Sequence, residues 1–268
     1  MKYGLTSNSL KIIAIILMVI DHIGLYMYNR LQPNTYYLFR SIGRLAMPIF
    51  VYLIIQGFFY TKNLKKYIFR IFILATITQI MLFITGYINE IYYPNYIVGV
   101  NKYLGVLYSY ALSLVLIAII DRKRVIPNFS ENVNLVIRIN IFILIELIYL
   151  KFRIEFDLRI PFMFLELYAI EKVFKKDNML FLKQNLKDKW NKVKSKSLYI
   201  SLIFITFALS LCFVEYSSGC KYAVLASIIP IILYNGKKGK NNKFIRIMFY
   251  AIFPIQHIIL YWIGMVNI

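Results

Sequence analysis

Asp21 and His22 stand side by side in the first long apolar run, residues 10–28, and Arg44 lies at the start of the second. Ionisable side chains are costly inside a bilayer and usually face a cavity in which they act. Imidazole is the side chain that titrates nearest neutral pH, which makes His22 a candidate general base. We expect Asp21 to pair with Arg44, because each charge neutralises the other in a low dielectric. The alternative is a buried network of these three residues that only holds helices together.

Other ionisable residues lie inside later apolar runs. Neighbouring residues on a helix point about 100° apart, so Asp21 is not expected to orient His22. His257, in the last apolar run, either meets His22 at a similar depth or is a hydrogen-bonded packing histidine. Glu146 and Glu166 lie midway along two further runs, and each is either a second base or a structural partner for an arginine.

Two polar segments flank the apolar runs. Asp157 directly precedes the sixth run and either borders an acceptor site or forms a local, solvated ion pair. Asn235 is followed by a basic turn that contains Gly236, Lys237 and Lys238. This turn either contacts a phosphate-bearing cofactor through its backbone and ammonium groups or serves as a cytoplasmic anchor. The sequence has no metal-binding, nucleophile-elbow or dinucleotide-binding motif, so we expect no metal site.

The elements that must position these residues are membrane-spanning helices. The chain has 268 residues, of which 60% are hydrophobic and only 16% are charged. Repeated apolar runs of this length are typical of a multi-pass protein of the cell membrane. We predict an all-α, polytopic helical bundle that forms a single domain over residues 1–268. Its nine expected helices cover residues 10–28, 42–61, 67–86, 103–120, 136–150, 158–174, 197–214, 219–234 and 246–266.

The charges between the runs predict the orientation of the chain. The formal net charge is +20, and most lysines and arginines lie in alternate short loops, with nine lysines in the stretch from Lys172 to Lys196. This pattern places the N-terminus in the cytoplasm and the C-terminus outside. The first outer loop is then expected to contain Arg30 and Arg40. Because the loop pattern explains the positive charge, we expect contact with the lipid bilayer and no nucleic-acid binding.

Three segments resemble the TraX family of membrane proteins, and together they bracket almost the whole chain. The first, residues 10–24, ends in Asp21-His22-Ile23-Gly24. The second contains Gly43-Arg44-Leu45-Ala46-Met47-Pro48 and continues to Gln56-Gly57-Phe58. The third contains Asn235-Gly236-Lys237-Lys238-Gly239 and leads to Phe249-Tyr250 and Phe253-Pro254. Asp157 fits a weaker motif.

The last helix departs from the family pattern, which resembles Tyr-Pro-x-His. Here the order is Phe253-Pro254-Ile255-Gln256-His257. A gapless alignment puts Gln256 at the histidine position and His257 one residue later. Both are therefore candidates for a second part of the site, together with Asp157 and Glu166.

The resemblance implies a transmembrane acyltransferase. Such a protein would use acetyl-CoA as co-substrate and modify pilin, a glycan or another envelope acceptor near the outer face. By this resemblance His22 deprotonates the acceptor, Arg44 stabilises charge, and the turn at Lys237 and Lys238 meets the phosphates of coenzyme A.

Two other functions remain open on the residues alone. The first is a proton-coupled transporter, in which Asp21, His22, Glu146 and Glu166 relay protons. The second is a non-enzymatic assembly subunit of a conjugation or envelope complex, in which the polar residues are structural.

Overall fold

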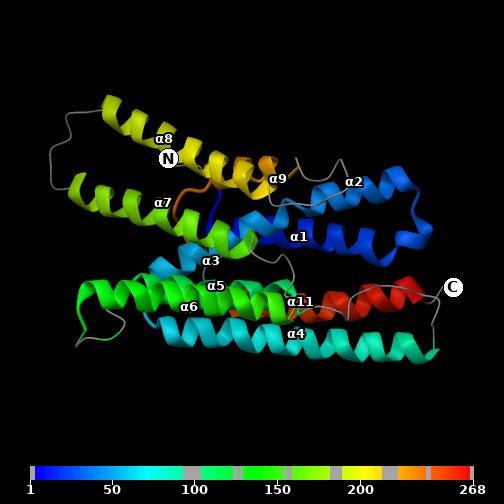
Figure 1. Ribbon diagram of the computed structural model, residues 1–268. Coiled ribbons are helices and arrows are strands. Elements are labelled where there is room, and N and C mark those ends of the chain that lie inside the picture. The colour runs from blue at the N-terminus through cyan, green and yellow to red at the C-terminus, as the bar shows by residue number, and fades with distance from the viewer. Residues whose placement is uncertain are drawn as a thin grey trace.

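The computed structural model describes residues 4–92, 104–122, 126, 129–152, 154, 159–181, 189–212, 223–239 and 243–265. Helices dominate this part of the chain, and it contains no β-strand. The helices are α1 Ser7–Tyr26, η1 Tyr28–Arg30, α2 Pro33–Gly43, α3 Ala46–Tyr60, α4 Leu64–Tyr92, α5 Val106–Ile120, α6 Glu131–Phe152, α7 Arg159–Phe181, α8 Lys189–Cys212, α9 Ala223–Ala226, α10 Ile228–Ile232 and α11 Lys243–Met265. Figure 1 shows them as one elongated, all-helical bundle.

Each of the nine predicted segments contains a helix within the described residues, which confirms the predicted fold class. Five helical segments of the described residues are long and apolar enough to cross a membrane: Ser7–Tyr26, Pro33–Tyr60, Leu64–Ile88, Glu131–Phe152 and Ile247–Gly264. Shorter apolar helices cover Val106–Ile120, Ser197–Leu209 and Ala223–Ile232. The protein is therefore a multi-pass membrane protein.

The second segment differs most from its prediction. Its helical structure begins at Pro33 rather than at residue 42, because α2 precedes α3. Pro33 suits the first position of a helix, where its missing N–H is not needed. Pro48 explains the interruption between α2 and α3, since its ring clashes with the carbonyl four residues earlier, at Arg44. Arg40 consequently lies on a helix, and the prediction that placed it in an outer loop was wrong.

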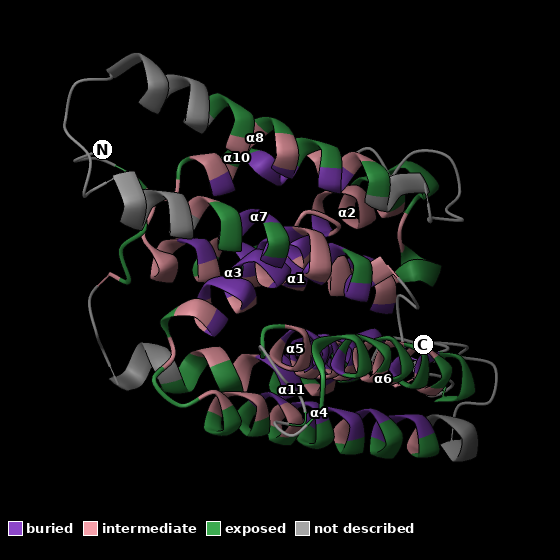
Figure 2. Cartoon of the chain, turned by 60° about the vertical axis from the view of Figure 1, so that its left-hand side comes forward, coloured by how far each residue is buried: buried purple, intermediate pink, exposed green. Residues whose placement is uncertain are grey.

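Central helices form the core, and peripheral ones cover it. Helix α1 packs on α2, α3 and α11, while α5 packs on α4, α6 and α7. Figure 2 shows the buried residues gathered on α1, α3 and α5, with exposed residues along the outer sides of α4, α6 and α8. On α4, Ile73, Ile77, Ile80 and Ile84 are 42–50% exposed. Their spacing puts them on one helical face, which is suited to contact lipid.

At one end of the bundle, hydrogen bonds join the loop after α1 to α11. The start of α2 and the C-terminal end of α11 share one end of the bundle, at the right of Figure 1. There Arg30 donates to the carbonyls of Ile263 (3.1 Å) and Gly264 (2.5 Å). These bonds satisfy carbonyls in the last turn of α11, which have no partner within the helix. The loop after α1 is thereby fixed to the end of α11.

Candidate functional site

Asp21 of α1 pairs with two arginines of the second segment. Its Oδ2 lies 2.8 Å from Nη1 of Arg40 and 3.8 Å from Nη1 of Arg44. The same nitrogen of Arg40 also donates to the backbone carbonyl of Asp21, at 3.3 Å. The expected partner, Arg44, is thus present, but Arg40 is the closer one. All three side chains are only 13–15% exposed. Two guanidiniums beside one carboxylate leave a net positive charge in the site.

Close packing of α1 on α2 sets this geometry. A Cβ atom on Gly43 would lie 2.1 Å from Cβ of Asp21, and one on Gly24 would lie 3.0 Å from Cβ of Phe39. Only glycine at these positions lets the two backbones approach so closely. Arg40 lies in the last turn of α2, and Arg44 directly follows its last residue, Gly43. Both guanidiniums therefore reach Asp21 from the end of α2.

The two histidines of the chain meet, although 235 positions separate them in the sequence. The ring centroids of His22 on α1 and His257 on α11 lie 4.5 Å apart, with the rings tilted by 56°. Nδ1 of His257 lies 2.9 Å from the hydroxyl of Tyr26, which is 1% exposed. Of the two alternatives for His257, the structure shows the contact with His22, and it also gives His257 a hydrogen-bond partner, Tyr26, which the sequence did not indicate.

A cavity of about 380 Å³ joins these groups. It lies between α1, the α2–α3 break, α4, α5 and α11. Its apolar lining includes Met18, Met47, Phe50, Leu82 and Phe253. Its polar lining consists of Asp21, His22, Arg40, Arg44, Thr78, Gln79, Tyr108, Tyr110 and His257. An imidazole pair and a cationic cluster therefore share one largely apolar chamber, where electrostatic interactions are stronger than in water.

The residues from α4 and α5 were missed by sequence reasoning. Gln79 accepts a hydrogen bond from the backbone N–H of Gly105 at 2.8 Å, which ties the start of α5 to α4. Tyr108 exchanges a 3.0 Å hydrogen bond with Thr76. Within residues 71–84, Gln79 is the largest polar residue among apolar ones and two threonines, and that is the signal that could have identified it.

Gln256 and the mid-span carboxylates lie outside the cavity lining. Gln256 is 4% exposed and adjoins His22. Glu166 faces Thr206 of α8, so the structure does not bring it to the histidines as a second base. Glu146, on the peripheral helix α6, is also remote from them. The predicted site residue Asp157 lies outside the described residues.

The basic turn after α10 packs against the start of α1. The N–H groups of Ser7 and Asn8 donate to the carbonyls of Lys237 (2.8 Å) and Lys238 (3.2 Å). The side chain of Asn235 accepts from the N–H of Lys237 and donates to the carbonyl of Gly4, both at 2.9 Å. Asn235 thus has a structural role in shaping the turn.

Two glycines shape the same turn. Gly236 and Gly239 have φ values of 75° and 85°, which other residues rarely adopt. Both lysine side chains are exposed, so they remain available to an anion. At about 1.5 Å per residue, α1 carries His22 about 22 Å from this turn.

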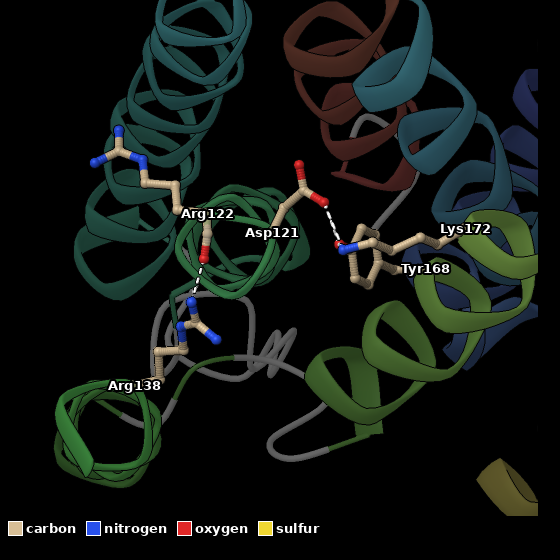
Figure 3. Close-up of polar contacts among 5 residues, drawn as sticks. All are labelled: Asp121, Arg122, Arg138, Tyr168 and Lys172. Carbon is tan, nitrogen blue, oxygen red and sulfur yellow. Dashed lines mark hydrogen bonds and ion pairs between the residues drawn. The ribbon is translucent and has the colours of Figure 1, made fainter. Parts of the chain in front are cut away.

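Further polar contacts join the helices at the same end of the bundle as this turn. Asp121, at the end of α5, accepts from Nζ of Lys172 at 2.9 Å and from the hydroxyl of Tyr168 (Figure 3). Arg138 of α6 donates to the carbonyl of Arg122. Burial acts to raise the pKa of Asp121, but the two hydrogen bonds and the ammonium charge outweigh it and leave this pKa below its usual value. These contacts link α5 to α6 and α7, remote from the cavity.

Comparisons with known proteins point to one family. The sequence model of the family described as "TraX protein" matches residues 6–264. A probable fimbrial assembly protein, FimC of serogroup H1, from Dichelobacter nodosus is 36% identical over 70 residues, which are 26% of this chain and 28% of that protein. An uncharacterised protein, RP591, from Rickettsia prowazekii (strain Madrid E) is 37% identical over 101 residues, or 38% of this chain and 35% of that protein. The matches thus span about a third of each relative's length, and no solved structure matches.

Proposed function

Because the chain belongs to the TraX family of membrane proteins, we propose that it is a membrane-embedded acyltransferase. It transfers an acetyl group from acetyl-CoA to an amine or hydroxyl acceptor. The observation that carries this proposal is the meeting of His22 and His257, at 4.5 Å, beside the Asp21–Arg40–Arg44 cluster in one cavity. A base and a cationic cluster in one apolar chamber are the groups that acyl transfer requires.

His22 acts as the general base in this proposal. It takes the proton of the acceptor N–H or O–H as that atom attacks the thioester carbonyl. The new C–N or C–O bond forms, and the C–S bond to coenzyme A breaks. The proton then passes from His22 to the departing sulfur, which leaves as the thiol. The two reactants supply all the atoms, so the protein contributes position, base and charge.

Arg44 and Arg40 stabilise the negative charge that develops on the carbonyl oxygen. One carboxylate offsets only one of the two guanidiniums, so the cluster keeps a positive charge where it borders the cavity. Preorganised charge of this kind is worth most in a site that excludes water. Asp21 holds the guanidiniums in place.

Lys237 and Lys238 are the proposed contacts for the phosphates of acetyl-CoA. Nζ of Lys11 lies 5.3 Å from the ring centroid of Phe249 and close enough to Lys238 for their charges to interact. Three ammonium groups therefore gather at the start of α1, and an anion would relieve their repulsion. The same lysines also suit an anchor that keeps the turn in the cytoplasm. A KM for acetyl-CoA that depends on salt indicates phosphate binding rather than anchoring alone.

The proposed acceptor is pilin or another envelope component. The relative from Dichelobacter nodosus is named for fimbrial assembly, which supports a pilin-related acceptor. The cluster of histidines and arginines lies near the end of the bundle to which α1 leads, away from the basic turn. An acceptor could therefore approach from the membrane face opposite the co-substrate.

Release of free thiol from acetyl-CoA by detergent-purified protein tests the proposal. The comparison sets wild type beside His22→Ala and the control Ile16→Ala, which shortens a lipid-facing residue (53% exposed) of the same helix. We expect thiol release from wild type and Ile16→Ala and its loss in His22→Ala, at matched monodispersity and melting temperature. Equal release by all three proteins would remove His22 from the mechanism.

The remaining outcomes separate the other functions. Well-folded wild type that neither binds nor hydrolyses acetyl-CoA, also with a pilin acceptor present, would overturn the acyltransferase proposal. Proton-coupled uptake into proteoliposomes would then support the transporter. Loss of stability alone in His22→Ala would support an assembly subunit.

A further inference from the structure

His22 and Gln256 together have three buried polar side-chain atoms without hydrogen bonds. Within the described residues, Nδ1 of His22 and both side-chain atoms of Gln256, Oε1 and Nε2, have no hydrogen-bond partner. The amide of Gln256 nevertheless adjoins the imidazole of His22, across the contact of α1 with α11. Buried polar groups without partners are rare, because each has lost its hydrogen bonds with water and gained none in the protein. Such neighbours are complementary, since the amide oxygen accepts and an imidazole N–H donates.

The two faces of His22 differ. His22 lines the cavity, whereas Gln256 adjoins His22 outside the cavity lining. Nδ1 is the ring nitrogen that is buried without a partner, whereas Nε2 is not among such atoms. The neighbouring carboxylate of Asp21 bonds with Arg40 through Oδ2, and Asp21 points about 100° away from His22 around the helix. Gln256 is therefore the polar side chain placed to hold Nδ1.

His257 shows the same arrangement with its bond formed. Its Nδ1 lies 2.9 Å from the hydroxyl of Tyr26, and the ring lines the cavity. Each histidine thus lines the cavity and lies beside a polar group of the opposite helix, α1 or α11. A base whose second nitrogen is held in this way keeps one tautomer and one ring orientation.

We propose that Gln256 is the positioning residue of His22: its amide oxygen accepts the Nδ1 hydrogen, which leaves Nε2 as the basic nitrogen in the cavity. The role assigned to Gln256 rests on the proposed function only for its effect on turnover, since the tautomer of His22 is a property of the resting protein. In this arrangement Gln256 orients the base His22, and the next residue, His257, lies beside that base.

Nitrogen-15 NMR of histidine-labelled protein tests the inference directly. The chain has only two histidines, so His22→Asn assigns both ring systems. We expect wild-type His22 to carry its hydrogen on Nδ1, with Nε2 unprotonated, and Gln256→Ala to give a mixture of tautomers. Gln256→Glu, which keeps a carboxyl oxygen acceptor, should retain the wild-type pattern. Thr85→Val, which removes a buried hydroxyl outside the cavity lining, is the control for packing.

Turnover provides the second readout. Gln256→Ala should lower kcat about 10- to 100-fold, the range typical when a group that orients an imidazole is removed, with KM for acetyl-CoA unchanged. Gln256→Glu should restore most of kcat. Ring-nitrogen shifts of His22 that are identical in wild type and Gln256→Ala would overturn the inference. Absence of thiol release from wild type would count against the proposed function only, because the tautomer is measured without substrate.

Discussion

The carboxylate of Asp21 lies 2.8 Å from Arg40, whereas the partner predicted from the sequence is Arg44, one helical turn later. When Arg40 is removed, Arg44, 3.8 Å away, still offsets the charge of Asp21, so Arg40→Leu removes mainly the hydrogen bond between Arg40 and the carboxylate. We therefore expect Arg40→Leu to lower the free energy of unfolding by about 2 kcal/mol, as for a hydrogen bond to a charged group. Denaturation in mixed micelles measures it. A smaller loss in Arg40→Leu than in Arg44→Leu would contradict the assignment of Arg40 as the main partner.

A methyl group at Gly43 should separate the two helices that carry this pair. The added Cβ of Gly43→Ala would lie 2.1 Å from Cβ of Asp21, so the backbones must move apart. We expect a lower melting temperature together with lower thiol release. Gly105→Ala is the stability control, because its methyl would meet Oε1 of Gln79 at 3.4 Å and Cδ1 of Leu82 at 3.9 Å, both ordinary contact distances. Equal melting temperatures in the two variants would show that α1 and α2 adapt without strain.

Removal of one hydroxyl should test the hydrogen bond to His257. Tyr26→Phe keeps the ring, which packs against Tyr261 at a centroid distance of 6.4 Å, but leaves Nδ1 of His257 without its 2.9 Å contact. We expect a loss of about 1 kcal/mol in stability and a fall in kcat with little change in KM. Steady-state kinetics on wild type and variant measure this. A rise in KM with unchanged kcat would assign Tyr26 to substrate binding instead.

The lysines of the basic turn allow a charge-matched comparison. Lys237→Gln with Lys238→Gln should raise KM for acetyl-CoA and leave kcat unchanged, because the phosphates lose their counter-charges. The control pair Lys65→Gln with Lys66→Gln removes the same charge from the start of α4. Added salt should weaken acetyl-CoA binding by wild type more than by the first pair. Equal KM values for both double variants would assign Lys237 and Lys238 to topology alone.

Acid should weaken the link between α5 and α7 at Asp121. The folded-state pKa of this carboxyl is lowered, so its contribution to stability is present above the unfolded pKa of about 3.9 and is lost as pH falls through the folded value. Asp121 is 43% exposed and Lys172 49%, so the contribution is under about 1 kcal/mol. We expect wild type to melt above Asp121→Asn at pH 7, and the difference to shrink as the pH falls below about 4. A constant difference across this range would show that Asp121 acts without its charge.

Local patterns were sufficient to predict the class of fold. Apolar runs long enough to cross a bilayer identify spans whatever their partners are, because each helix satisfies its own backbone hydrogen bonds. The same runs made Asp21 and His22 conspicuous, since charged or titratable groups are costly in them. Local patterns failed at Arg40, because α2 is less apolar than α3 and therefore resembles a loop.

The sequence by itself determined which parts of the chain enter the membrane and which residues are chemically notable there. Only the tertiary structure decided which of them meet: His22 with His257, Asp21 with Arg40, and both sets with Gln79 and Tyr108 around one cavity. The physical reason is that hydropathy depends on each segment alone. Contacts between residues on separate helices depend instead on close approaches such as Gly43 against Asp21, which set the rotation and depth of one helix against the next.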